Sequence, residues 1–327
     1  MTLEDIYFEF RQLLKKHFPE LHFTHTGYVG SDFNAELPTE NRMFANTSYF
    51  YKEELSFIHF TSIDNLLSIL NNREIRLYNL HSSKDEEEFY YAAKELGLQA
   101  DEIEFAKNYY YTYSFCKKED LTNKFLWREY GKDSSGVAIE FSIENNPLDW
   151  DNFMISNVYY EVPNSFHEFA KEINVLKKQF GITISGFNIG KLIGFYKKSD
   201  LHNEKEVRIA TYFPYKDFEE YLKFAKSEFR IDKENHRNRI TNYISLPLWV
   251  DNNSALVKSD NPELDRRSPF NDNYFLRRPK ILIKNIYFGQ NCGLNNQELS
   301  KFTLILTDII RFNLGYRLLL ELNIYRI

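Results

Sequence analysis

Three short stretches of this sequence carry residue types that could act on a sugar or a nucleotide. In the stretch 203–208, Glu204 and Glu206 stand two residues apart, so an extended strand would place both carboxylates, and Arg208, on one face. Neighbouring carboxylates raise each other's pKa, and a fixed carboxylate stabilises positive charge that develops on a sugar carbon. A solvated run of charges is the commoner explanation for a Glu-Lys-Glu pattern.

The second stretch is a short alternating segment that ends in hydroxyl residues. His59 could hydrogen-bond a ribose hydroxyl through either ring nitrogen. Thr61 and Ser62 follow, immediately before a predicted helix whose free N–H groups could receive an anion such as a pyrophosphate. The alternative is a structural histidine beside an ordinary helix cap.

The third stretch, 125–131, contains two large aromatic residues at helical spacing. Trp127 and Tyr130 lie three residues apart, so on a helical turn they would share a face and could clamp a flat heteroaromatic ring. Arg128 would point elsewhere, toward a phosphate or an acidic partner. The alternative is a Trp–Tyr corner that anchors the strand beginning near Val137.

Periodicity along the chain indicates which elements position these stretches. Many strands and fewer helices predict an α+β fold with a central mixed or split β-sheet flanked by helices. We expect one domain over 1–327, with a core at about 55–290, an N-terminal helix at 2–18 and a C-terminal helix and strand at 294–327. The other expected strands are 55–61, 75–80, 110–116, 137–141, 155–161, 206–213 and 281–288, and the other helices are 63–70, 84–96, 165–180 and 215–229. Residues 19–51 have no clear pattern, and 251–279 are typical of a long loop or lid.

Composition excludes several classes of protein. Cys116 and Cys292 have no paired spacing, which argues against a disulfide framework or a cysteine-bound zinc. Charged residues near the N-terminus argue against a signal peptide, and no apolar run reaches the roughly 20 residues of a membrane span. We therefore expect a cytoplasmic protein without membrane contact.

Charge and motif content narrow the choice of partners. The net charge of -6 predicts no general attraction to nucleic acid, although the basic stretch 230–239 could act locally. The eight histidines form no H-x-x-x-H pair, and no glycine-rich phosphate loop is present. Aromatic residues make up 17% of the chain, which indicates either a stacking pocket or a core rich in Phe and Tyr.

An ordered series of landmarks over about 55–290 resembles a bacterial family of proteins of unknown function. The landmarks are a Thr-Ser strand before an L-x-x-I-L helix, an S-F-C strand, a W-x-x-Y-G turn, a G-[VF]-x-I-x-F strand, an E-x-E-x-R strand and a strand ending in glycine. They fall here at 59–70, 113–116, 127–131, 136–141, 204–208 and 288–289.

The opening segment and the late Glu-bearing strand also resemble those of DNA-modifying ADP-ribosyltransferase toxins. This resemblance implies that NAD is the substrate, that His59 binds its ribose, that Tyr130 or Trp127 stacks on nicotinamide, and that Glu206 stabilises the oxocarbenium ion. Within it, the remaining NAD-binding residues would be Thr61, Ser62, Arg128, Glu204 and Arg208. It further implies a toxin or anti-phage effector with a nucleic-acid or protein acceptor and an antitoxin or immunity partner. The sequence lacks the Y-G-x-G-x-Y loop and the S-T-S strand of the best-known transferases.

Two other functions remain open at this point. The same aromatic residues could recognise a nucleotide or a nucleic-acid end without chemistry. Alternatively, Glu204, Glu206 and Asp200 could surround a metal ion in a nuclease-like hydrolase. Release of nicotinamide from NAD would distinguish the enzymatic hypothesis from both.

Overall fold

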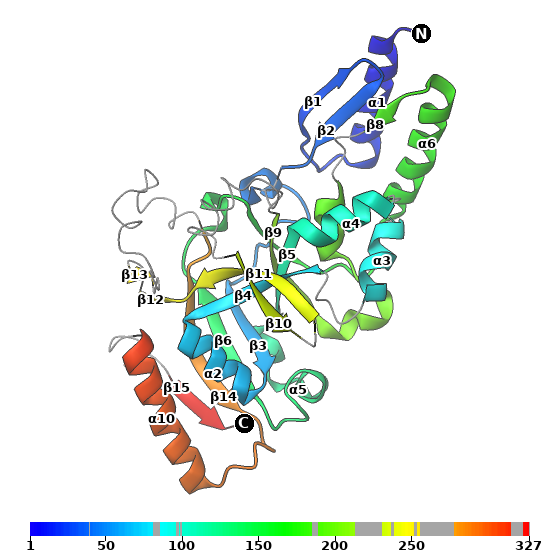
Figure 1. Cartoon of the computed structure of the whole chain (residues 1–327). Helices are drawn as coiled ribbons and strands as arrows, with labels where there is room; N and C mark the ends of the chain where they lie inside the picture. Colours follow the sequence, from blue (N-terminus) through cyan, green and yellow to red (C-terminus); the bar gives the residue numbers. More distant parts are fainter. Residues whose placement is uncertain are drawn as a thin grey trace.

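The chain folds into a large mixed sheet flanked by helices, as the computed structural model in Figure 1 shows. The structure describes residues 1–38, 40–80, 86–95, 98, 100–184, 189–212, 231–236, 239–251, 254–255, 278–314 and 323–326. The expected α+β class with a mixed sheet is therefore confirmed.

The strands and helices follow one another along the chain with short connections. The strands are β1 (Thr24–Val29), β2 (Asp32–Glu36), β3 (Ser56–Thr61), β4 (Glu74–Asn79), β5 (Tyr110–Lys117), β6 (Val137–Ile143), β7 (Phe153–Asn157), β8 (Thr183–Ile184), β9 (Glu206–Tyr212), β10 (Ile231–His236), β11 (Arg239–Pro247), β12 (Trp249–Asp251), β13 (Ser254–Ala255), β14 (Ile281–Phe288) and β15 (Asn323–Arg326). The α-helices are α1 (Leu3–His17), α2 (Ile63–Asn72), α3 (Glu86–Glu95), α4 (Ala100–Tyr109), α5 (Lys124–Glu129), α6 (Asn164–Phe180) and α10 (Asn296–Leu314). Short 3-10 helices are η1 (Asn41–Phe44), η3 (Lys118–Thr122), η4 (Pro147–Asp149), η5 (Ile189–Phe195) and η6 (Ser199–Glu204).

The main sheet branches at β5. One path runs β10-β11-β4-β5-β3-β6-β14-β15, while β9 also pairs with β5, and β7 pairs with β9. All these pairings are antiparallel except β14 with β15. The strand β5 thus has β4 and β3 along different parts of its length, and β9 alongside it over residues 110–116.

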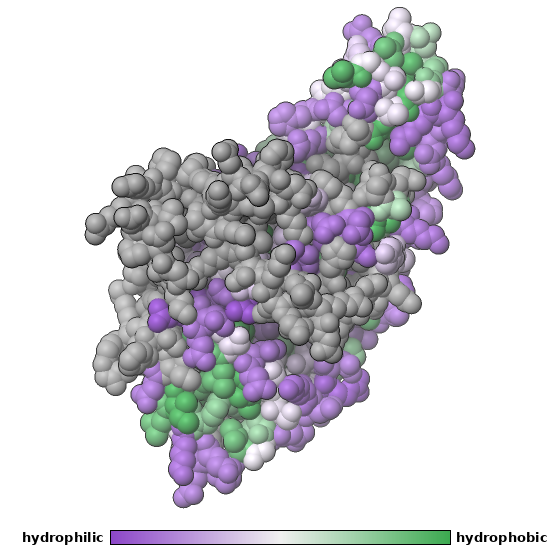
Figure 2. All heavy atoms as spheres, in the orientation of Figure 1, coloured by the Kyte–Doolittle hydropathy of each residue, from purple (hydrophilic) through white to green (hydrophobic). Residues whose placement is uncertain are grey.

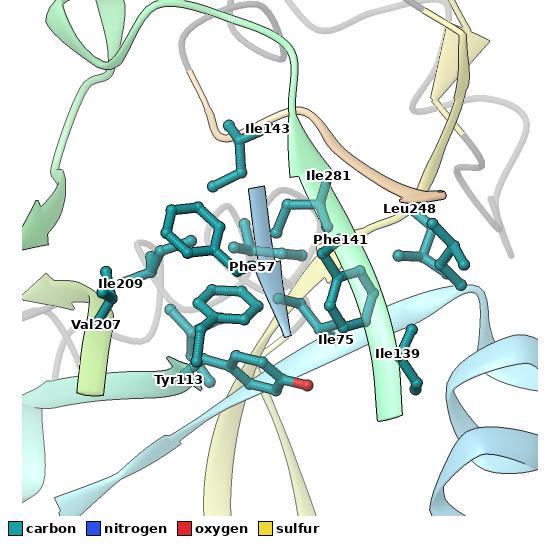
Figure 3. Close-up of a cluster of buried hydrophobic side chains, with 14 of the residues drawn as sticks. Phe57, Ile75, Tyr113, Ile139, Phe141, Ile143, Val207, Ile209, Leu248 and Ile281 are labelled. Atoms are coloured by element: carbon teal, nitrogen blue, oxygen red, sulfur yellow. The ribbon is translucent and has the colours of Figure 1, made fainter. Parts of the chain in front are cut away.

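The two faces of the sheet bury different clusters of side chains. On the first face, Phe57, Phe141 and Ile209 belong to an apolar core to which α2 contributes Leu66 and α10 contributes Leu306 (Figure 3). The second face packs partly against α6 and η5 and partly against α5. Because successive residues of a strand point to opposite faces, the register of each strand decides which cluster a side chain joins.

Local signals explain the ends of several helices. Thr2 and Asp5 form a reciprocal capping box at the start of α1, and the hydroxyl of Ser62 accepts a hydrogen bond from the amide of Asn65 at the start of α2. Gly181 ends α6 in the left-handed region, at a φ of 63°. These helices match the sequence-based expectations to within two residues.

The N-terminal part of the chain projects from one end of the main sheet (Figure 1). Residues 19–51, which had no clear pattern, contain β1, β2 and η1, and β8 adds to β2. The helix α1 lies against α6, where Lys16 and His17 both contact Glu172. The small sheet and α6 thus hold the opening helix in place.

A few expectations differ from the structure or fall outside it. The strand expected at 155–161 is β7, which spans Phe153–Asn157, because the amide of Val158 already bonds to the carbonyl of Glu206 at the end of the ladder. The helix expected at 215–229 lies outside the described residues, as do the side chains of the basic stretch 230–239 and most of the loop expected at 251–279.

The surface of the described part shows one apolar region near the C-terminal helix. In Figure 2, hydrophobic side chains gather over the place that α10 occupies in Figure 1, where Leu304 and Ile305 are 65% and 53% exposed. In the described segments, none of the helices combines the length and the apolar composition needed to cross a bilayer.

Candidate functional site

A straight row of paired residues crosses the second face of the sheet. Glu206 on β9 pairs with Cys116 on β5, and Cys116 pairs with Ile58 on β3. Ile58 in turn pairs with Glu140 on β6, which pairs with Asn285 on β14. Directly paired residues project to the same side of a sheet, so this row brings two buried carboxylates onto one face, three strands apart.

Glu206 is held between two cationic side chains. Its Oε1 lies 2.5 Å from Nε of Arg208, and its Oε2 lies 2.6 Å from Nζ of Lys197. Burial alone would raise the pKa of Glu206, but the charges of Arg208 and Lys197 lower it to about 2. The amide of Glu206 donates to the hydroxyl of Tyr160 at 2.9 Å, so this carboxylate is ionised and fixed at neutral pH.

Glu204 shares the cation of Glu206 but has a different second partner. Its Oε2 lies 2.6 Å from Nζ of Lys197, and its Oε1 accepts a hydrogen bond from the hydroxyl of Tyr130. Tyr130 is 41% exposed, whereas Glu204 is only 7% exposed. The site therefore contains a buried carboxylate whose neutral partner reaches the surface.

The two glutamates meet for a reason other than strand alternation. Glu204 ends η6, and Lys205 adopts a left-handed conformation with a φ of 45° before β9 begins at Glu206. The expectation that both lie on one extended strand is therefore wrong, since the chain turns between them. Both carboxylates nevertheless bond to Lys197, so the expected pairing of Glu204, Glu206 and Arg208 in one site is found.

The W-x-x-Y-G turn anchors Tyr130 but does not clamp a ring. Trp127 is 5% exposed, donates from Nε1 to the carbonyl of Leu121 at 2.6 Å, and packs edge-on against Phe60. A side chain on Gly131 would approach Trp127 to within 2.7 Å, so the turn is closely packed. Trp127 is thus a core residue that fixes the direction of Tyr130, and its expected stacking on nicotinamide is wrong.

Arg128 points away from this site. Its guanidinium is 2.8 Å from the carboxylate of Glu129 and lies over the ring of Phe125, and its side chain is 63% exposed. The charge is neutralised by an adjacent residue at the surface. The structure therefore does not bring Arg128 together with Glu204 and Glu206.

His59 lies on the opposite face of the sheet from Glu206. It neighbours Ile58 along β3, and its ring packs 4.8 Å from that of Tyr113 on the first face. Nδ1 lies 3.2 Å from the carbonyl oxygen of Ser114, and burial lowers the pKa of the imidazole to about 4. The expected convergence of His59 and Glu206 on one site is wrong, because strand register separates them.

The hydroxyls after His59 belong to the cap of α2. The amide nitrogen of the Asn65 side chain donates to the hydroxyl of Thr61 at 2.9 Å, and the Asn65 backbone donates to Ser62 at 3.1 Å. Thr61 and Ser62 are 5% and 8% exposed. Both are thus placed as capping residues, and the structure does not bring them together with the glutamates.

Sequence reasoning missed the cation at the centre of the site. Lys197 follows the irregular segment η5 and precedes η6, where neither alternation nor helical spacing marks it. Tyr160 lies after β7 in an equally irregular stretch. A lysine between an apolar segment and a Glu-bearing strand was the one available signal, because a buried carboxylate pair needs a nearby cation.

The carboxylates are not arranged as the nuclease hypothesis required. Among the residues that the structure describes, no group of three or more His, Cys, Asp or Glu side chains is placed to hold a metal ion. Glu204 and Glu206 are bridged by Lys197 instead of being grouped with Asp200. The geometry therefore favours chemistry or binding by the side chains themselves.

Comparison with known proteins gives one match. Residues 126–209 match the model of a family described as a protein of unknown function, DUF2971. This segment runs from the turn that carries Tyr130 to the strand that carries Glu206 and Arg208, so it contains the whole cluster around Lys197. No curated protein and no solved structure has a significant match.

Proposed function

We propose that this site cleaves the N-glycosidic bond of NAD, with transfer of ADP-ribose or hydrolysis as the outcome. Breaking this bond develops positive charge on the ribose carbon, which a fixed, ionised carboxylate stabilises. The observation that carries the proposal is the pair of buried glutamates on Lys197, reached from the surface through the hydroxyl of Tyr130. The resemblance to ADP-ribosyltransferase toxins at 204–208 supports the choice of NAD.

Within the pair, we assign the reacting carboxylate to Glu204. Glu206 has cations on both of its oxygens, and these offset its ability to stabilise a further positive charge. Glu204 has a cation on Oε2 alone, while its Oε1 is bonded to a neutral phenol. A ribose hydroxyl or the developing cation can replace that phenol without separating an ion pair.

Glu206 then acts as a positioning residue. It holds Lys197 and Arg208 in place, and Arg208 is also anchored by a 2.6 Å hydrogen bond to the carbonyl of Gly194. Lys197 in turn keeps Glu204 ionised and directs Oε1 toward Tyr130. This division of roles exchanges the two glutamates relative to the sequence-based hypothesis and leaves His59 out of the site.

The proposal is tested by incubating the purified chain with NAD and measuring nicotinamide. The wild type is expected to release nicotinamide, and Glu204→Gln to release it at least about 100-fold more slowly, because the carboxylate charge is lost while the side-chain shape is kept. Glu129→Gln, on the adjoining exposed turn, is the control and is expected to retain activity.

The fate of labelled ADP-ribose identifies the reaction. Label on a protein or nucleic acid indicates transfer, and free ADP-ribose indicates hydrolysis. Binding of NAD without nicotinamide release would contradict the enzymatic proposal and support a binding module. Undiminished release by Glu204→Gln would contradict the role given to that residue.

A further inference from the structure

Asp120 is a buried carboxylate with one unsatisfied oxygen. It lies in η3, between β5 and α5, and is 5% exposed. Its Oδ1 lies 3.5 Å from the amide nitrogen of Asn123 and 3.7 Å from Nζ of Lys205. Within the described part of the chain, its Oδ2 has no hydrogen-bond partner. A buried charged oxygen without a donor is costly, so it indicates a group that binds there.

The position of Asp120 places it beside the glutamate pair. The pKa of the Cys116 thiol is raised by burial and by the charges of Glu206, Asp120 and Glu204, which surround this one residue. Cys116 is also the strand partner of Glu206. Asp120, Glu204 and Glu206 therefore border the same small region of the second face.

The short helix η3 is held rigidly over that region. At one end, Nζ of Lys118 lies 2.6 Å from Oε1 of Glu140. At the other, the carbonyl of Leu121 accepts the indole hydrogen bond from Trp127, on the helix that leads to Tyr130. The same turn thus positions both Asp120 and Tyr130, which fixes the unsatisfied oxygen relative to Glu204.

The chemistry of an open carboxylate oxygen selects a ligand that donates a hydrogen. Three buried carboxylates face two buried cations, Lys197 and Arg208, while Lys205 is at the surface with its side chain 57% exposed. Because Oδ2 is covered, a ligand reaches it by displacing the exposed side chains of Lys205 or Tyr130. A sugar hydroxyl can do so as a neutral donor.

We propose that Asp120 determines specificity by accepting a hydrogen bond from a ribose hydroxyl of the ligand. This inference rests on the proposed function, since it names the group of a nicotinamide nucleotide that the site recognises. It differs from the assignment to Glu204, because Asp120 selects the ligand and takes no part in bond cleavage.

The experiment compares the binding of NAD with that of its analogues lacking the 2′- or the 3′-hydroxyl of the nicotinamide ribose. By calorimetry, the wild type is expected to bind one of these analogues about 10- to 100-fold more weakly than NAD, the range for a charge-assisted hydrogen bond. Asp120→Asn is expected to lower this preference to less than about threefold, because its amide cannot reproduce two carboxylate oxygens. Asp149→Asn, at an exposed position in η4, is the control and is expected to keep the preference.

Thermal unfolding supplies a second readout. Without ligand, Asp120→Asn is expected to unfold at the same or a higher temperature than the wild type, since it removes an unpaired buried charge. An Asp120→Asn variant that keeps the hydroxyl preference would overturn the inference, as would a wild type that binds NAD and both analogues equally. Failure of the wild type to bind NAD would overturn the proposed function as well, whereas nicotinamide release without a hydroxyl preference would overturn this inference alone.

Discussion

Replacing Lys197 by methionine tests whether the glutamate pair depends on a single buried cation. The substitution keeps the length of the side chain and removes its charge, leaving Glu204 with the hydroxyl of Tyr130 and Glu206 with Arg208. The fall in the pKa of Glu206 from 4.5 to about 2 corresponds to about 3 kcal/mol of folding free energy, part of which comes from Arg208. Since Glu204 also loses its partner, we expect Lys197→Met to destabilise the fold by about 3 to 5 kcal/mol near pH 7.

The matched control is Lys16→Met, because Lys16 makes an ion pair with Glu172 at the same 2.6 Å distance as Lys197 with Glu204. The difference is exposure: 58% and 38% for the first pair against 7% and 9% for the second. Water screens the exposed pair, so we expect Lys16→Met to cost less than about 1 kcal/mol. Urea unfolding at several pH values measures both effects.

The pH dependence has a defined sign. A carboxylate with a lowered pKa in the folded state stabilises the fold above its unfolded pKa, and this contribution disappears as the pH falls through the folded pKa. For Glu206 the window runs from 4.5 down to about 2, so the stability difference between wild type and Lys197→Met should be largest above pH 4.5 and should close below it. Equal costs for Lys197→Met and Lys16→Met at pH 7 would refute the reasoning.

Three further predictions follow from the fold and the site. A Cβ on Gly136 would lie 2.3 Å from the carbonyl oxygen of Thr61, so Gly136→Ala should cost at least about 2 kcal/mol in urea unfolding, whereas Gly27→Ala, whose Cβ meets its nearest neighbour at 3.4 Å, should cost less than about 1 kcal/mol. His59→Gln should leave nicotinamide release within about threefold of wild type when assayed as folded protein, because the imidazole lies on the opposite face from Glu206; a loss of two orders of magnitude would contradict that placement. Induced expression of the wild type should lower cellular NAD and slow growth, as an effector role implies, and Glu204→Gln should do neither; an unchanged NAD level with wild type would count against that role.

Local patterns in the sequence were sufficient to predict much of the sheet. The alternation in β3 and the hydroxyl of Ser62 marked the strand, the cap and the start of α2, and the structure has all three there. The apolar spacing of α6 and its terminal Gly181 likewise marked a helix within one residue of the observed bounds. These features depend on neighbours close in sequence, which is why they could be predicted.

The candidate site depends on contacts that no local pattern reveals. Whether His59 and Glu206 share a face is decided by two registers, Ile58 with Cys116 and Cys116 with Glu206, which join segments about 60 and 90 residues apart. Trp127 looked equally suited to a ligand or to the core, and only its contact with Phe60 shows that it belongs to the core. Lys197 had no pattern at all.

The most direct test of the account compares NAD binding and nicotinamide release in one variant, Glu204→Gln. We predict that this variant binds NAD with a dissociation constant within about threefold of wild type while its release of nicotinamide falls at least about 100-fold, since the carboxylate acts on the developing charge more than on the bound substrate. Release at the wild-type rate by Glu204→Gln would contradict the claim that the glutamate beside Tyr130 performs the reaction.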